Sequence, residues 1–186
     1  MKILLASKSP RRKGLLESLG YTFDVISIDC DESFPSDLPV DEIAGYLSEK
    51  KSNAFRTLQN GEVLITADTI VALENEILGK PKDADDAKEM LKKLSGKTHQ
   101  VYTGITIKTS ENQITETDVA DVSFSELSDS EIEYYIKNFK PFDKAGSYGI
   151  QEWLGMSKIT EIKGSFYTIM GLPTHLIYEI LKKINF

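Results

Sequence analysis

The chain has 186 residues, of which 40% are hydrophobic and 27% are charged, so we expect one globular domain over residues 1–186. The formal net charge of −7 argues against nucleic acid or an anionic membrane surface as a partner. No stretch approaches the ~20 apolar residues of a spanning helix. Cys30 is the only cysteine, which excludes an internal disulfide and fits a reducing, cytoplasmic location.

The N-terminal segment predicts a short buried strand, Lys2–Ser7, followed directly by a helix. Ser9 is a favoured N-cap and Pro10 is favoured at the first helical position. The helix is expected to reach Leu19 and to end at Gly20.

The start of this helix carries an unusual cluster of cations: Lys8, Arg11, Arg12 and Lys13. Positive charge is disfavoured at the positive end of a helix dipole, so the cluster predicts a bound anion. Free N–H groups at a helix start bind phosphate, and arginine and the hydroxyls of Ser7 and Ser9 add further donors. The alternative is a solvated basic turn without a ligand.

The next segment predicts a strand over 23–28, a loop and a helix over about 41–58. The most apolar stretch, EVLITADTIVAL at 62–73, predicts a central strand covered on both faces. After a turn, the chain is expected to reverse direction at ILGKP and to form a helix over 84–94 capped by Asp83. Strands over 101–109 and 114–124 follow, and then a helix from the Ser128 capping box to about 139. The last predicted elements are strands over 158–162 and 166–170 and a helix through Ile184. This mixture predicts an α/β or α+β protein.

Asp68 lies inside the apolar strand, where an isolated carboxylate costs several kcal/mol. It must therefore be paired, bind a metal or lie at an open strand end. A second acidic group, Asp29, Asp31 and Glu32, follows the strand over 23–28. Mg²⁺ is usually held by one or two carboxylates together with substrate phosphates. A structural ion pair and an exposed acidic turn are the alternatives.

Lysines from two segments could face such a site. Lys80 follows a glycine that would let a ligand approach the backbone, although GxxxxGK[ST] is absent. Lys50 and Lys51 both flank the apolar stripe of the helix over 41–58, and periodicity leaves open which one turns inward.

Several other kinds of site lack support. His99 and His175 are most simply packing or surface residues. The chain lacks Gly-x-Ser-x-Gly and has too few ligands for zinc. VISIDCDES resembles the strand end of haloacid-dehalogenase-type phosphatases, with Asp29 as nucleophile. The basic helix start would then go unused, and no separate strand precedes Asp83, Asp85 and Asp86.

Several long motifs, which occur in the same order as in a known family, give a more specific resemblance than any single motif does. LLASKSPRRKGLL, DES, the Lys51 helix, TADTIVALENEILGKPKDADDAKEMLKKLSGKTHQVYTG, DKAGSYGIQ and GSFYTIMGLP resemble the Maf family of nucleoside triphosphate pyrophosphatases nearly end to end. The resemblance implies an inosine-triphosphate-pyrophosphatase-like fold, an elongated mixed sheet with flanking helices and two lobes around a cleft. It also implies a homodimer.

The implied reaction is hydrolysis of a nucleoside triphosphate to the monophosphate and pyrophosphate with a divalent cation, Mg²⁺ or Mn²⁺. By resemblance, Asp68 is the proton acceptor and binds the metal together with Glu32. The phosphates are implied to contact Ser7, Arg11, Arg12, Lys51 and Lys80.

Arg11, Thr69 and Gln151 match the family branch that acts on dTTP and UTP, rather than the branch acting on 7-methyl-GTP. An amide such as Gln151 can donate to a pyrimidine carbonyl and accept from its ring N–H. Glu152 departs from the small residue common after this glutamine, and Ser52 departs from a usual alanine. The implied role is removal of unwanted pyrimidine triphosphates. The alternative is a nucleotide-binding regulator of cell division and septum formation that needs no turnover.

Overall fold

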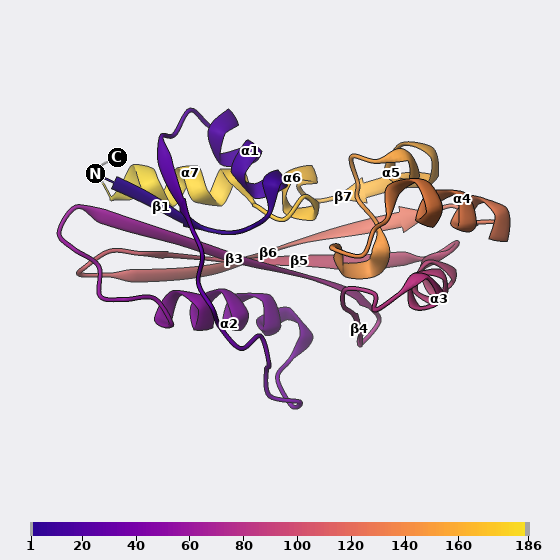
Figure 1. Ribbon diagram of the computed structural model, residues 1–186, viewed down its shortest axis with the longest axis horizontal. Coiled ribbons are helices and arrows are strands. Elements are labelled where there is room, and N and C mark those ends of the chain that lie inside the picture. The colour runs from indigo at the N-terminus through magenta and orange to yellow at the C-terminus, as the bar shows by residue number, and fades with distance from the viewer. Residues whose placement is uncertain (1, 185–186) are drawn as a thin grey trace. The chain divides into compact units, whose positions relative to one another are not determined.

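The computed structural model describes residues 2–184, and the chain divides into two compact units (Figure 1). The first unit comprises Met1–Thr69, Thr103–Asp118 and Gly171–Phe186, and the second comprises Ile70–Tyr102 and Val119–Met170. The expected single domain and the implied cleft stay predictions.

Among the described residues, the strands form one mixed sheet in the order β2-β1-β3-β5-β6-β7, with β4 paired to β3. Their bounds are β1 (Lys2–Ala6), β2 (Phe23–Ile26), β3 (Glu62–Leu73), β4 (Glu76–Leu78), β5 (Thr98–Lys108), β6 (Gln113–Phe124) and β7 (Ile159–Lys163). β1 is parallel to β2 and β3, whereas β4 is antiparallel to β3 and β7 to β6. The predicted α/β class is therefore confirmed.

In the first unit, α2 (Val40–Asn53) covers one face of the sheet, and α1 (Pro10–Ser18) and α7 (Thr174–Lys183) lie on the other (Figure 1). β3 lies between β1 and β5, and its first half is apolar. Val63, Leu64 and Ile65 are wholly buried there, as expected for a strand covered on both faces. Gly104 of β5 lets α2 approach closely, because a Cβ there would lie 2.3 Å from the backbone of Ala44.

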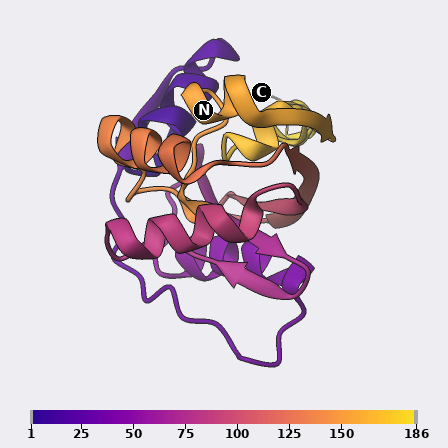
Figure 2. The ribbon, with the colours of Figure 1, turned by 90° about the vertical axis from the view of Figure 1, so that its right-hand side faces the viewer.

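In the second unit, α3 (Ala84–Leu94) and α4 (Asp129–Phe139) lie side by side, as Figure 2 shows. An ion pair of 2.6 Å between Lys88 and Glu133 joins them. The remaining helices are α5 (Trp153–Lys158) and α6 (Phe166–Ile169), and the turn Ala145–Ser147 is a 3₁₀ helix. Within residues 2–184, no helix combines the length and apolarity needed to cross a membrane.

The predicted helix caps are confirmed. The hydroxyl of Ser9 accepts from Arg12 N, Asp83 accepts from Asp86 N, and Ser128 forms a capping box with Glu131. α1 ends as expected, because Gly20 adopts φ +85°, a left-handed conformation that glycine tolerates best.

Two predictions were wrong, and one helix was not predicted. Residues 166–170 were expected as a strand but form α6, because so short an apolar run does not separate helix from strand by its period. The helix over 41–58 ends at Asn53, and Arg56 beyond it bonds instead to Glu62 at 2.7 Å. Sequence reasoning missed α5, which contains a helix-weakening Gly155.

His99 is a packing residue, as expected. It is wholly buried in β5, its Nε2 lies 2.7 Å from the hydroxyl of Tyr148, and its ring makes edge contacts with Phe124 and Tyr148. Burial lowers the pKa of His99 from 6.5 to about 4. The imidazole is therefore neutral in the folded protein at neutral pH.

This burial predicts a loss of stability in mild acid. The unfolded chain protonates His99 near pH 6.5 and the folded protein only near pH 4, so stability present above pH 6.5 is lost as the pH falls towards 4. We expect the free energy of unfolding to be about 2 kcal/mol lower at pH 5 than at pH 7.5. Urea unfolding at both pH values measures it. His99→Gln should lose most of this dependence, and an unchanged slope in that variant would contradict the prediction.

Candidate active site

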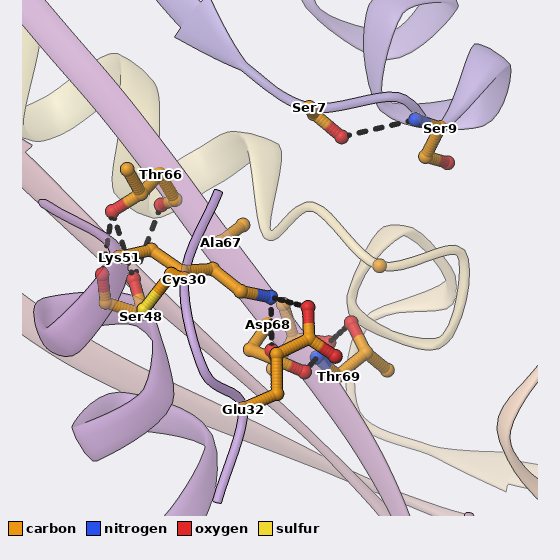
Figure 3. A network of polar contacts seen from close by, with 12 residues as sticks. Ser7, Ser9, Cys30, Glu32, Ser48, Lys51, Thr66, Ala67, Asp68 and Thr69 are labelled. Carbon is orange, nitrogen blue, oxygen red and sulfur yellow. Dashed lines mark hydrogen bonds and ion pairs between the residues drawn. The ribbon is translucent and has the colours of Figure 1, made fainter. Parts of the chain in front are cut away.

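Three charged side chains from different elements of the first unit meet at one point (Figure 3). Lys51 of α2 forms ion pairs with Asp68 of β3 and with Glu32 of the loop after β2, the latter at 2.9 Å. The side chains of Lys51 and Asp68 are 17% and 14% exposed, whereas that of Glu32 is 54% exposed. The group is therefore accessible to solvent on the Glu32 side.

Asp68 is held in a defined orientation. One carboxylate oxygen accepts from Thr69 N at 2.6 Å, and the other accepts from Lys51. With these two bonds in place, the carboxylate oxygens can still accept a hydrogen bond from a bound water through their remaining lone pairs. Of the three alternatives that the sequence left open for Asp68, the structure shows a pairing, with Lys51.

The structure shows which of the two adjacent lysines turns inward. Lys51 reaches Asp68, while the ammonium of Lys50 donates to Asp31 Oδ2 at 3.0 Å and to Ser33 O at 2.8 Å. Bonds from Ser33, and then from Lys50, lower the pKa of Asp31 to about 2. Lys50 thus ties the loop that carries Glu32 to α2.

A buried hydroxyl network sets α2 against the sheet one turn before Lys51 (Figure 3). Ser48 Oγ lies 3.0 Å from Thr106 Oγ1, and Thr66 Oγ1 donates to Ser48 O at 2.7 Å. All three side chains are wholly buried. Because buried hydroxyls need partners, this network fixes the point on α2 from which Lys51 extends.

The basic start of α1 lies in the same unit. The hydroxyl of Ser7 accepts from Ser9 N at 3.2 Å and is nearly buried, and Ser9 caps the helix. Arg11 is half-buried in the first turn.

Arg12 bonds to both neighbours of Asp68. Its guanidinium donates to Ala67 O at 2.9 Å and to Thr69 Oγ1 at 3.0 Å, and its Nε donates to Gly171 O at 2.7 Å. These bonds use three of the five guanidinium N–H groups. Burial lowers the pKa of Arg12, and the charge of Asp68 opposes that effect. Arg12 therefore joins α1 to the part of β3 that carries Asp68, which the sequence did not predict.

The donor set fits a hard divalent cation. Glu32 and Asp68 converge on the single positive charge of Lys51, so the two carboxylates already share a position favourable to a cation. The described residues contain no group of three or more His, Cys, Asp or Glu that could hold a metal. Mg²⁺ suits such a set, because it commonly takes one or two carboxylates and completes its shell with water and phosphate oxygens.

The other predicted residues lie in the second unit or outside the cluster. Lys80 is exposed after Gly79, whose carbonyl accepts from Gly146 N at 3.1 Å, and Gln151 is exposed in a turn. Asp29, the nucleophile of the phosphatase alternative, is exposed and takes no part in the ion pairs that join Glu32, Lys51 and Asp68. His175 is half exposed on α7.

Comparison with known proteins shows a match to the Maf-like protein family over residues 2–184. A dTTP/UTP pyrophosphatase of Bacteroides thetaiotaomicron is 51% identical, covering 98% of this chain and 96% of that protein. A dTTP/UTP pyrophosphatase of Phocaeicola vulgatus is 50% identical with the same coverage. Among solved structures, the Ham1 protein of Staphylococcus aureus matches with 19% identity and a TM-score of 0.43, covering 69% of this chain and 73% of that one.

The three bonds of Arg12 predict that Arg12→Lys destabilises the protein. A lysine ammonium cannot reach the acceptors on Ala67, Thr69 and Gly171 together, so we expect the free energy of unfolding to fall by roughly 1–3 kcal/mol. Urea unfolding at neutral pH measures the change. Lys13→Gln is the control on the same helix, because Lys13 is exposed and should alter stability by less than about 0.5 kcal/mol. Equal effects of the two substitutions would contradict the prediction.

Proposed function

Because this chain belongs to the family of Maf-like proteins, as its motifs predicted, we propose that it hydrolyses dTTP and UTP to the nucleoside monophosphate and pyrophosphate. The observation that carries the proposal is the meeting of Glu32, Lys51 and Asp68 in the unit that also holds the basic start of α1. Close relatives named dTTP/UTP pyrophosphatase support the choice of substrates.

In the proposed reaction, a water oxygen attacks the α-phosphorus and the bond to the pyrophosphate oxygen breaks. Asp68 accepts a proton from the attacking water, a role that suits an ionised carboxylate already oriented by Thr69 N and Lys51. This assignment of Asp68 as general base rests on its geometry and on the family resemblance.

The cationic groups would bind the triphosphate. Ser7, Arg11 and the start of α1 offer hydroxyl, guanidinium and backbone donors, and Arg12 keeps two guanidinium N–H groups beyond its three protein bonds. Lys51 and Lys80 would add point charges. Together these groups would neutralise charge that develops on the leaving pyrophosphate.

Glu32 and Asp68 would hold the divalent cation, Mg²⁺ or Mn²⁺. Such a cation, when bound, supplies Lewis-acid polarisation of phosphoryl oxygens and lowers the pKa of water. Lys51 keeps the two carboxylates close together, so their mutual repulsion is reduced in the free protein.

Arg11, Thr69 and Gln151 are proposed to set the preference for thymine and uracil. The hydroxyl of Thr69 accepts from Arg12 and lies 2.9 Å from Thr103 Oγ1, so its orientation is constrained. The homodimer and a link to septum formation stay predictions of the resemblance, and the cytoplasmic location stays a prediction based on the single cysteine.

The central test is product analysis with Asp68→Asn. With Mg²⁺ or Mn²⁺, the unaltered protein should release pyrophosphate and monophosphate from dTTP and UTP, and Asp68→Asn should lower kcat by roughly 10²–10⁴-fold. The measurement is chromatography of the nucleotide products with a coupled pyrophosphate assay.

Asp29→Asn is the matched control and should retain activity, since Asp29 is exposed and outside the three-residue cluster. Inorganic phosphate as the direct product, lost in Asp29→Asn, would favour the phosphatase alternative. An unaltered protein that binds dTTP without hydrolysing any triphosphate would favour the nucleotide-binding regulator.

The two-carboxylate arrangement also predicts how activity depends on the metal. Chelation by EDTA should abolish hydrolysis, and added Mg²⁺ or Mn²⁺ should restore it. Glu32→Gln should raise the Mg²⁺ concentration for half-maximal activity by at least about ten-fold. Removal of a residue that only orients a metal ligand already lowers metal affinity by about that factor, and Glu32 is proposed to bind the metal directly. Glu42→Gln, exposed on α2, is the control and should leave it unchanged. Full activity in EDTA would reject the metal assignment.

A further inference from the structure

The segment that carries Gln151 is a tight turn whose two ends bond to the same hydroxyl. Glu152 N donates to Gly149 O at 3.0 Å, which closes the turn, and the Gln151 side chain is exposed. The hydroxyl of Tyr135 accepts from Gly149 N at 2.9 Å and donates to the carboxylate of Glu152. One phenol oxygen therefore holds both ends of the turn.

Tyr135 is itself rigidly placed. It is wholly buried in α4, and its ring stacks on Phe139 with centroids 5.1 Å apart. Burial, reinforced by Glu152, raises the pKa of the Tyr135 hydroxyl, so the hydroxyl keeps its proton and remains a donor. The phenol is therefore the donor in the bond to Glu152.

The second oxygen of Glu152 is also bound. It lies 3.1 Å from the ammonium of Lys144, whose side chain is 9% exposed and which also contacts Asp143 at 2.7 Å. Removing one partner of a buried ion pair is far more costly than the net value of the pair. Glu152 is therefore fixed at both oxygens.

Steric contacts leave the turn little room to move. A Cβ at Gly149 would lie 2.8 Å from Glu152 Cδ, and a Cβ at Gly155 would lie 1.8 Å from Ile150 O. α5 thus packs directly against the backbone of the turn. Among the residues of this turn, Gln151 is the exposed polar one.

We propose that Tyr135 and Glu152 are positioning residues: they fix the turn from which Gln151 presents its amide for recognition of thymine and uracil. This inference rests on the proposed function. A carboxamide carries both a donor and an acceptor, so a loosely held one can turn to match cytosine as well as uracil. Selectivity between them depends on holding the amide in place. Glu152 stands where the resemblance implies a small residue, so this hold is a feature of the present chain.

The test measures kcat and KM for UTP, dTTP and CTP with Tyr135→Phe. We expect KM for UTP and dTTP to rise and the ratio of kcat/KM for UTP over CTP to fall about ten-fold, the effect of one lost hydrogen bond. We expect kcat for UTP to change less than about two-fold, because Tyr135 does not contact the groups proposed for the chemical step. Tyr148→Phe is the matched control, since it removes a buried hydroxyl that bonds to His99 and not to the turn.

Two further variants separate positioning from general destabilisation. In a Gln151→Ala background, Tyr135→Phe should have no additional effect on the UTP/CTP ratio. Glu152→Gln, which keeps an oxygen acceptor for Tyr135, should retain more selectivity than Glu152→Ala, and it serves the same test if Tyr135→Phe does not fold.

Unchanged selectivity in Tyr135→Phe, an equal loss in Tyr148→Phe, or the same loss with Gln151 absent would each overturn the inference. Failure of the unaltered protein to release pyrophosphate from any triphosphate would instead reject the proposed function. The two failures are therefore distinguishable in one set of assays.

Discussion

The carboxylate of Asp68 lies in the middle of β3, and the rest of the first unit supplies its partners. Burying a charge without a counter-charge is too costly for a folded protein of ordinary stability. Lys51 provides the positive charge, and Thr69 N binds the second oxygen. The hydroxyls of Ser48 and Thr66 then place α2 so that Lys51 can reach Asp68. A central strand with a functional carboxylate thus dictates much of the packing around it.

The charge of Asp68 also bears on the basic cluster at the start of α1, which is unusual in a chain with a net charge of −7. Arg12 is half-buried and bonds to the two residues flanking Asp68, so part of the basic cluster is used to build the site. The charges of Asp68 and Glu32 only partly offset the effect of burial, which lowers the pKa of Arg12. Arg11 and Ser7 stay at the start of α1, where an anionic ligand would reduce repulsion among the cations. The cluster thus serves both packing and the proposed binding.

The features that depend on local chemistry could be predicted from the sequence. The apolar run around Asp68 required a partner for it, and the caps at Ser9, Asp83 and Ser128 gave the helix starts. Contacts between distant segments could not be predicted from one sequence. The choice between Lys50 and Lys51 depends on the position of the Glu32 loop. The short run at Phe166–Ile169 suits a strand or a helix, and its neighbours decide between them.

Tyr135 and Glu152 illustrate the same limit in the second unit. In the sequence, Tyr135 is one apolar position on an amphipathic helix, and Glu152 is a departure from a family pattern. Only the fold shows that their side chains meet, and that Lys144 balances the partly buried carboxylate. A charged residue can replace a small one there because a phenol and an ammonium are already within reach. This departure from the family pattern therefore fixes one end of the turn from which Gln151 extends.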